Sequence, residues 1–282
     1  MASVVDSHHH FWDLSKLDYP WMDDLGMPPG DSVLRQNRLP SDLKPLIDGV
    51  GVERTVIVQA HSSLEEARWL LQLAAENEFI AGVVAWVELT DPDIGATLDG
   101  LQRDPYFKGV RHIWHDEPDD DWIMRPDVLR GLRELATRDI PYDLLPRPQH
   151  LRYIPRVLDA VPGLRTVVDH IAKPLVKEKI FEPWESDLRR VAEISDVYCK
   201  LSGMVTEADH DNWRPEDLAP YVSRVVEMFG HDRLMWGSDW PVCTLAGSYE
   251  QVFRAAEHAL GPMSDGARAA VFGGNAERFY RL

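Results

Sequence analysis

The 282-residue sequence has few cysteines and no long apolar segment. Only Cys199 and Cys243 occur, which excludes a framework of disulfides and predicts a reducing compartment. No run approaches the about 18 apolar residues of a membrane-spanning helix. The N-terminus also lacks the basic and apolar regions of a secretory signal. These absences predict a cytoplasmic protein that has no membrane partner.

Basic residues are also scarce, because 30 Lys and Arg face 47 Asp and Glu and give a net charge of -17. Nucleic acids and anionic membranes are bound by clustered Lys and Arg, so both are excluded as partners. Local fields can oppose the net charge, so an anionic small molecule is not excluded. We therefore expect a small-molecule substrate, and the oligomeric state stays open.

A glycine-rich phosphate turn is missing as well, since no GxGxxG follows any apolar run. This argues against a doubly wound open sheet, the rival architecture. Short β-branched runs do occur at intervals and predict eight strands. The expected strands are Val4–Asp6, Thr55–Gln59, Ala81–Val87, Gly109–Ile113, Pro141–Leu145, Leu164–Asp169, Val197–Leu201 and Arg233–Trp236.

Amphipathic segments lie between and after these runs. Helices are expected at Leu64–Glu78, from Asp91-Pro92 onward, and at Pro126–Arg138, Gln149–Val161, Trp184–Ile194, Pro215–Phe229, Tyr249–Leu260 and Ser264–Tyr280. Repeated strand–helix units produce parallel strands, and eight of them close a barrel. We predict an α/β fold, a single (β/α)8 TIM barrel over residues 1–282. Residues 14–40, rich in Pro, Gly, Asp and Trp, are expected to form a long loop over the barrel mouth.

Candidate metal ligands follow three of the expected strands, where such barrels carry their chemistry. His8 and His10 lie two residues apart, so both can face the barrel axis while His9 points away. His170 follows the sixth strand. Asp239 follows Gly-Ser after the eighth strand, small residues that suggest a close approach to other backbone. Imidazole and carboxylate groups suit a divalent ion, and Asp239 could also take a proton from water.

Two cations lie inside expected strands. Arg111 needs a carboxylate of the protein or of a substrate, because a buried arginine is costly without one. Lys200 could hold an oxyanion or a substrate carboxylate, and a structural salt bridge is the alternative for both residues. Five further residues near strand ends are candidate substrate contacts: His61, Trp86, His112, Glu207 and Trp240.

Several motifs are familiar as a set: VVDSHHHFWD, FKGVRHIWHDEPDDDW, DHIAKP, CKLSGMVTEAD, RLMWGSDWPV and GGNAERFYRL. With them the chain resembles the amidohydrolase-2 family of the metal-dependent hydrolase superfamily, and within it the sugar-lactonase group. The resemblance runs from Val5 to Leu282 and implies an amidohydrolase-like barrel that hydrolyses lactones. It implies metal ligation by His8, His10, His170 and Asp239, water activation by Asp239, and catalytic or substrate contacts from His170, Arg111 and Lys200.

One departure from the family concerns the metal. Binuclear members use a bridging lysine or glutamate from strand four, where this sequence has Arg111-His112. We therefore expect one divalent ion at most, zinc, with metal-free catalysis as the alternative.

The leading hypothesis is a hydrolase that opens a sugar-derived aldonolactone with water activated by Asp239. One alternative is a metal-dependent decarboxylase of a small aromatic or unsaturated acid. Another is a non-catalytic ligand-binding barrel, which would bury Asp239 and His170 in salt bridges and leave no open cleft.

Overall fold

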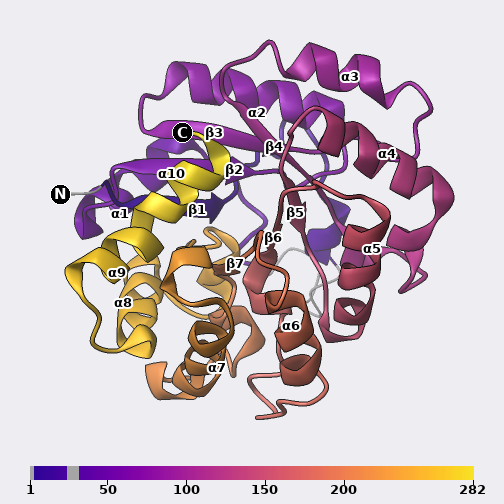
Figure 1. Ribbon diagram of the computed structural model, residues 1–282. Helices are drawn as coiled ribbons and strands as arrows, with labels where there is room; N and C mark the ends of the chain where they lie inside the picture. The colour runs from indigo at the N-terminus through magenta and orange to yellow at the C-terminus, as the bar shows by residue number, and fades with distance from the viewer. Residues whose placement is uncertain (1–2, 24–31) are drawn as a thin grey trace.

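The computed structural model describes residues 3–23 and 32–282. At its centre lies one sheet of eight parallel strands in chain order, β1 to β8 (Figure 1). The strands are β1 Val5–His9, β2 Arg54–Val58, β3 Ile80–Ala85, β4 Phe107–His112, β5 Tyr142–Leu144, β6 Thr166–Val168, β7 Val197–Leu201 and β8 Leu234–Trp236. The predicted (β/α)8 barrel is confirmed, and every predicted strand overlaps an observed one.

The first and last strands meet through backbone hydrogen bonds just beyond β8. The Asp239 N–H donates to the carbonyl of His8 at 2.8 Å, and the His10 N–H donates to the carbonyl of Trp240 at 2.7 Å. A Cβ on Gly237 would lie 2.6 Å from the Cβ of His8, so only glycine permits this approach. The close backbone contact predicted after strand eight is therefore present.

Helices form a ring around the strands (Figure 1). They bury one apolar face against the sheet, as α4 does with Val128, Leu132 and Leu135. The helices are α1 Pro40–Val50, α2 Leu64–Glu76, α3 Ile94–Leu101, α4 Pro126–Thr137, α5 Ile154–Ala160, α6 Trp184–Ala192, α7 Pro215–Phe229, α8 Tyr249–Leu260, α9 Asp265–Ala269 and α10 Asn275–Tyr280. Across the described residues, none of the helices has the length and apolarity needed to cross a membrane.

Three helical segments differ from the prediction. Helix α1 was not predicted, because only Leu43 and Ile47 of its residues are buried and the pattern is short. The segment predicted as one helix over Ser264–Tyr280 is interrupted by a π-helical turn at Ala270–Gly274. The helix predicted from Gln149 begins as a 3-10 turn and becomes α-helical only at Ile154.

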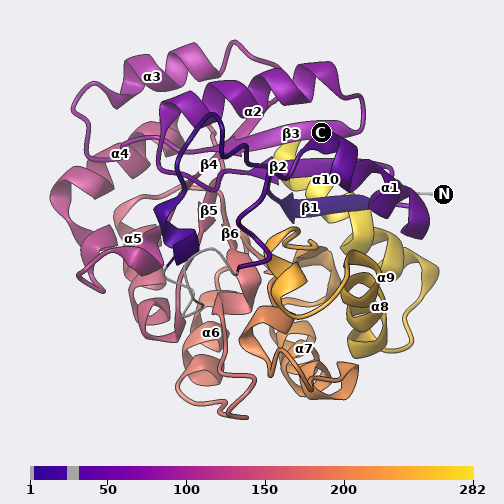
Figure 2. The ribbon, with the colours of Figure 1, turned by 180° about the vertical axis from the view of Figure 1, so that it is seen from behind.

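The two ends of the barrel are covered by different segments. Helix α10 lies over the end seen in Figure 1, whereas the segment that follows β1 crosses the opposite end, seen in Figure 2. That segment is tied down where the Trp12 N–H donates to the carbonyl of Arg38 at 3.0 Å. Part of the loop predicted over residues 14–40, at 24–31, lies outside the described residues.

We predict that Gly131→Ala destabilises the barrel although it lies in the middle of helix α4. Alanine normally stabilises a helix interior relative to glycine by about 1 kcal/mol. At this position, however, the added Cβ would overlap the backbone carbonyl of Leu89. We expect a loss of roughly 1–3 kcal/mol in the free energy of unfolding, measured by urea denaturation.

Gly100→Ala in helix α3 is the matched control, because no atom lies within 4 Å of its added Cβ. It should leave stability unchanged or raise it by up to about 1 kcal/mol. Equal effects of the two substitutions would contradict the close packing of α4 on Leu89.

Candidate active site

Four polar side chains meet at the carboxyl end of the barrel. His8 lies in β1, His10 follows it, His170 follows β6 and Asp239 follows β8. Their Nε2 atoms lie 3.8 Å (His8), 3.3 Å (His10) and 4.0 Å (His170) from the same oxygen, Asp239 Oδ1. His9 is not part of this group, because its ring packs on Phe11 instead. The residues expected to gather at one rim do so.

The donor atoms fit a single divalent ion. One ligand atom each from His8, His170 and Asp239 lies within 4.8 Å of the others. His10 Nδ1 lies 2.7 Å from the carbonyl of Val58, and because a carbonyl only accepts, this nitrogen carries a hydrogen. With Nδ1 so occupied, Nε2 is the His10 nitrogen that faces the Asp239 carboxylate, at 3.3 Å, and the two atoms could bind a cation together.

Burial keeps two of these imidazoles neutral. It lowers the pKa of His8 well below its ordinary range, and the neighbouring Lys200 ammonium lowers it further. Burial and the neighbouring His8 ring do the same to the pKa of His170. A neutral imidazole offers the lone pair that a metal ion requires.

The backbone that presents these groups is strained. His170, Ile171, Ala172 and Lys173 have φ angles of 56°, 47°, 62° and 51°, and Asp239 has a φ of 57°. The left-handed region costs an L residue roughly 1–2 kcal/mol, and such strain is concentrated at functional sites. The left-handed turn brings both His170 and Lys173 to the wall of one cavity.

Beneath the histidines lies a buried group of paired charges. The Lys200 ammonium lies 2.6 Å from Asp143 Oδ2, 3.1 Å from Asp169 Oδ1 and 3.2 Å from His8 Nδ1. Tyr280 of α10 also donates to Asp143 Oδ2, at 2.7 Å. Burial raises the pKa of Asp143 to about 6, with the Lys200 charge opposing it. Lys200 is fully buried, so it supports His8 from below and does not line the cavity.

Arg111 lies between the buried charges and the cavity. Its Nη1 lies 3.3 Å from His8 Nε2 and 3.5 Å from Asp169 Oδ2, and its Nη2 donates to the carbonyl of Gln59. Unlike Lys200, it also lines the cavity above the histidines. The protein carboxylate that a buried arginine requires is thus Asp169.

This cavity, of about 540 Å³, opens above the four clustered residues. Its wall includes His10, Arg111, His170 and Asp239. Sequence reasoning did not single out the other polar residues on it: His115, Asp116, Arg147 and Lys173. All four lie in segments that follow a barrel strand, which was the available signal.

The five candidate substrate contacts lie outside the lining of this cavity. The Trp86 Nε1–H donates to His112 Nδ1 at 3.2 Å, and Glu207 pairs with Lys173 at 3.0 Å. The His61 ring packs on Tyr19, and Trp240 packs on Phe11.

Known proteins are similar to this chain along its whole length. The amidohydrolase family profile matches residues 5–282. This chain belongs to the amidohydrolase family.

The relatives of this amidohydrolase include two curated lactonases. The L-fucono-1,5-lactonase of Burkholderia ambifaria is 39% identical over 100% of this chain and 97% of its own length. The L-fucono-1,5-lactonase of Burkholderia multivorans is 35% identical with the same coverage. A crystal structure of an amidohydrolase from Burkholderia multivorans with bound zinc has a TM-score of 0.92, 35% identity and full coverage of both chains.

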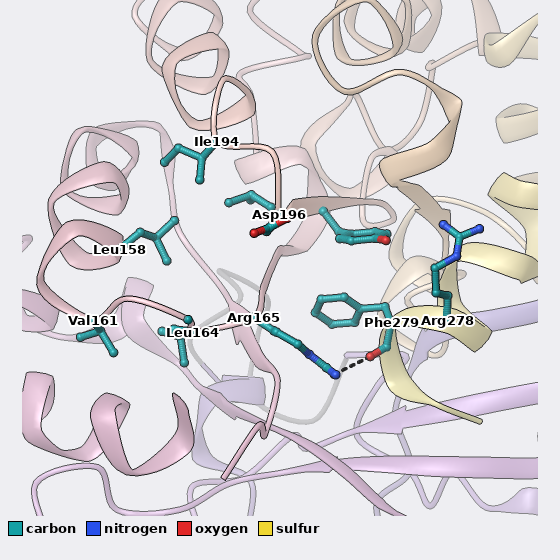
Figure 3. A pocket seen from close by; sticks show the side chains of 11 residues that line it. Leu158, Val161, Leu164, Arg165, Ile194, Asp196, Arg278 and Phe279 are labelled. Carbon is teal, nitrogen blue, oxygen red and sulfur yellow. Dashed lines mark hydrogen bonds between the residues drawn. The ribbon is translucent and has the colours of Figure 1, made fainter. Parts of the chain in front are cut away.

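A second cavity of about 370 Å³ lies apart from the clustered histidines (Figure 3). It is bounded by Leu158 of α5, by Ile194 and Asp196 before β7, and by Phe279 of α10. Arg165 on its wall donates to the carbonyl of Phe279 at 2.6 Å. None of the four candidate metal ligands lines it, so the candidate active site is confined to the first cavity.

Glu66 of α2 fastens the segment that crosses the barrel mouth. Its carboxylate accepts hydrogen bonds from the backbone N–H groups of Ala60 and His61 at 3.0 and 2.9 Å, and from the Tyr19 hydroxyl at 3.1 Å. Burial raises the pKa of Glu66 to about 7, although these donors oppose the shift. One carboxylate thus joins the loops that follow β1 and β2.

We predict that stability falls as pH rises because of Glu66. Its pKa is higher in the folded protein, about 7, than the ordinary 4.5, so the folded state holds a proton that the unfolded chain has lost. This contribution is complete below about pH 4.5 and is lost as pH rises through 7. Between pH 5 and pH 8 we expect Glu66→Gln to gain roughly 2–3 kcal/mol relative to wild type.

Urea denaturation of both proteins at the two pH values measures this difference. Glu65→Gln, on the exposed side of the same helix, is the matched control and should run parallel to wild type. If the free energy of unfolding of Glu66→Gln also changed with pH in parallel with that of wild type, Glu66 would be ionised from pH 5 to pH 8.

Proposed function

We propose that this amidohydrolase hydrolyses a small lactone, a sugar-derived aldonolactone. The observation that carries the proposal is the approach of three imidazole nitrogens to one oxygen of Asp239 at the floor of a cavity. The two curated relatives above, both L-fucono-1,5-lactonases, support a sugar lactone as substrate. Both cysteines are free and buried, consistent with the cytoplasmic location expected from the sequence.

We propose that His8, His10, His170 and Asp239 hold one zinc ion. The neutral imidazoles of His8 and His170, the approach of His10 Nε2 to Asp239 and the zinc-bound relative support this assignment. Bound there, zinc would polarise an ester carbonyl and make water more acidic. Lys200 and Asp169 would hold the His8 ring in place, and Asp169 Oδ1 lies 3.4 Å from His8 Nδ1.

In the proposed reaction Asp239 is the general base. Its carboxylate takes a proton from water, and the oxygen of that water attacks the lactone carbonyl carbon. The ring C–O bond then breaks, and the departing oxygen takes the proton back from Asp239. Arg111 on the cavity wall would orient the substrate. The product is a hydroxy acid, which is a carboxylate at neutral pH.

Both alternatives have less support. Decarboxylation is disfavoured because the two curated relatives above are lactonases. A non-catalytic barrel would bury Asp239 and His170 in salt bridges and have no open cleft. The two residues are buried and lie 4.0 Å apart, but both line a cavity of about 540 Å³, which disfavours this alternative.

Asp239→Asn should lower kcat by roughly 10²–10⁴-fold, because an amide cannot accept the proton from water. The rate is measured as proton release from an aldonolactone panel that includes L-fucono-1,5-lactone. Asp232→Asn, before the start of β8, removes an exposed carboxylate and is the matched control. Near-normal turnover by folded Asp239→Asn would refute its role as base.

Removal of the metal should abolish most activity. We expect dialysis against a chelator to lower the lactonase rate by more than about tenfold, and zinc to restore it. His170→Ala should retain less than one zinc per chain by elemental analysis, whereas wild type retains one. Full activity of metal-free wild type would instead favour the metal-free route that the sequence left open.

A further inference from the structure

The cavity above Asp239 carries more positive charge than the rest of the molecule would suggest. Among the described residues, three cations line it, Arg111, Arg147 and Lys173, together with two acids, Asp116 and Asp239. The chain as a whole has a net charge of -17. Three cations gathered on the wall of one cavity in so acidic a protein favour a ligand with negative charge.

Lys173 is held in place on this wall. The left-handed turn that presents His170 also carries Lys173, and the Lys173 ammonium lies 3.0 Å from Glu207 Oε1. An ammonium has three protons, so two remain for a ligand. Arg111, by contrast, already contacts Asp169.

Arg147 is the lining cation for which the described residues offer no acid. It follows β5, and its backbone N–H donates to His150 Nδ1 at 2.9 Å. Among residues 3–23 and 32–282, no carboxylate lies within salt-bridge distance of its guanidinium, and Arg147 lines the cavity. The planar guanidinium fork matches the two oxygens of a carboxylate.

His115 lies within the electric field of all three lining cations. Burial, followed by the charges of Lys173, Arg147 and Arg111, lowers the pKa of His115 to about 2, so the ring is neutral. Its buried Nδ1 has no hydrogen-bond partner in the part of the chain that the structure describes. His115 Nε2 lies 3.3 Å from Asp116 Oδ1 and so carries the ring hydrogen, which leaves Nδ1 to accept a hydrogen bond from a ligand hydroxyl.

We propose that Arg147 and Lys173 form a carboxylate-binding subsite on the wall of the active-site cavity, and that His115 Nδ1 beside them accepts a hydrogen bond from a hydroxyl of the same ligand. The proposal rests on the proposed lactonase function. The carboxylate has two sources: the group formed when the ring opens, or a second carboxylate on the lactone of a sugar diacid. Arg147 and Lys173 would then govern product binding in the first case and substrate choice in the second.

Direct binding tests the subsite without turnover. Calorimetry compares the aldonate of the lactone hydrolysed fastest with its neutral aldonamide, on wild type, Arg147→Gln and Lys173→Met. We expect each substitution to weaken aldonate binding about tenfold and to change aldonamide binding less than about twofold. Arg147 is exposed, so its variant should fold even if Lys173→Met does not. Arg103→Gln, an exposed arginine outside the cavity, is the matched control.

Turnover distinguishes the two sources. If the substrate supplies the carboxylate, wild type prefers the diacid lactone over the neutral one in kcat/KM, and Arg147→Gln loses that preference. If the product supplies it, wild type shows no preference while aldonate binding still depends on Arg147. Aldonate binding unchanged within about twofold in folded Arg147→Gln would overturn the subsite. Absence of any lactone hydrolysis by wild type would refute the proposed function instead.

Discussion

The closure of the barrel between β1 and β8 is the constraint on which the site depends. Two backbone hydrogen bonds join the segments that carry His8, His10 and Asp239, at 2.8 and 2.7 Å. The carboxylate of Asp6 strengthens this seam, because it accepts from the Ser238 N–H and the Tyr249 hydroxyl, each at 2.9 Å. Any change that opened the seam would separate Asp239 from His8 and His10.

A second constraint is electrical. The interior beneath the site holds two cations and two carboxylates, and they are paired across β4, β5, β6 and β7. Pairing limits the cost of burying these charges. Because Lys200 and Arg111 contact His8, they also disfavour a third positive charge on its ring. The same group therefore supports the histidines and keeps them suited to hold a metal ion.

Sequence reasoning was most successful where position along a strand decides position in space. The alternation of a strand and the end-of-strand rule of the barrel placed His8, His10, His170 and Asp239 at one rim. It was less successful in predicting which side chains near the strand ends reach the cavity. Lys200 and Trp86 both lie near strand ends, yet neither lines the cavity, because packing within the barrel and between loops directs their side chains elsewhere.

Backbone conformation explains another omission. Lys173 reaches the cavity through four successive residues of positive φ, none of them glycine, and no propensity rule predicts such a turn. Helix α1 escaped notice for a different reason, since two buried side chains in eleven residues give little periodicity.

One contact beneath the site forms late, because Tyr280 lies in the last helix of the chain. It reaches from α10 to Asp143, which holds the Lys200 ammonium next to His8. His8 lies in the first strand, whereas Tyr280 is synthesised only after all eight strands have been made. The support beneath His8 is therefore incomplete until the segment that follows β8 has been made. The nascent barrel must hold Lys200 and its two carboxylates without the tyrosine hydroxyl until α10 docks.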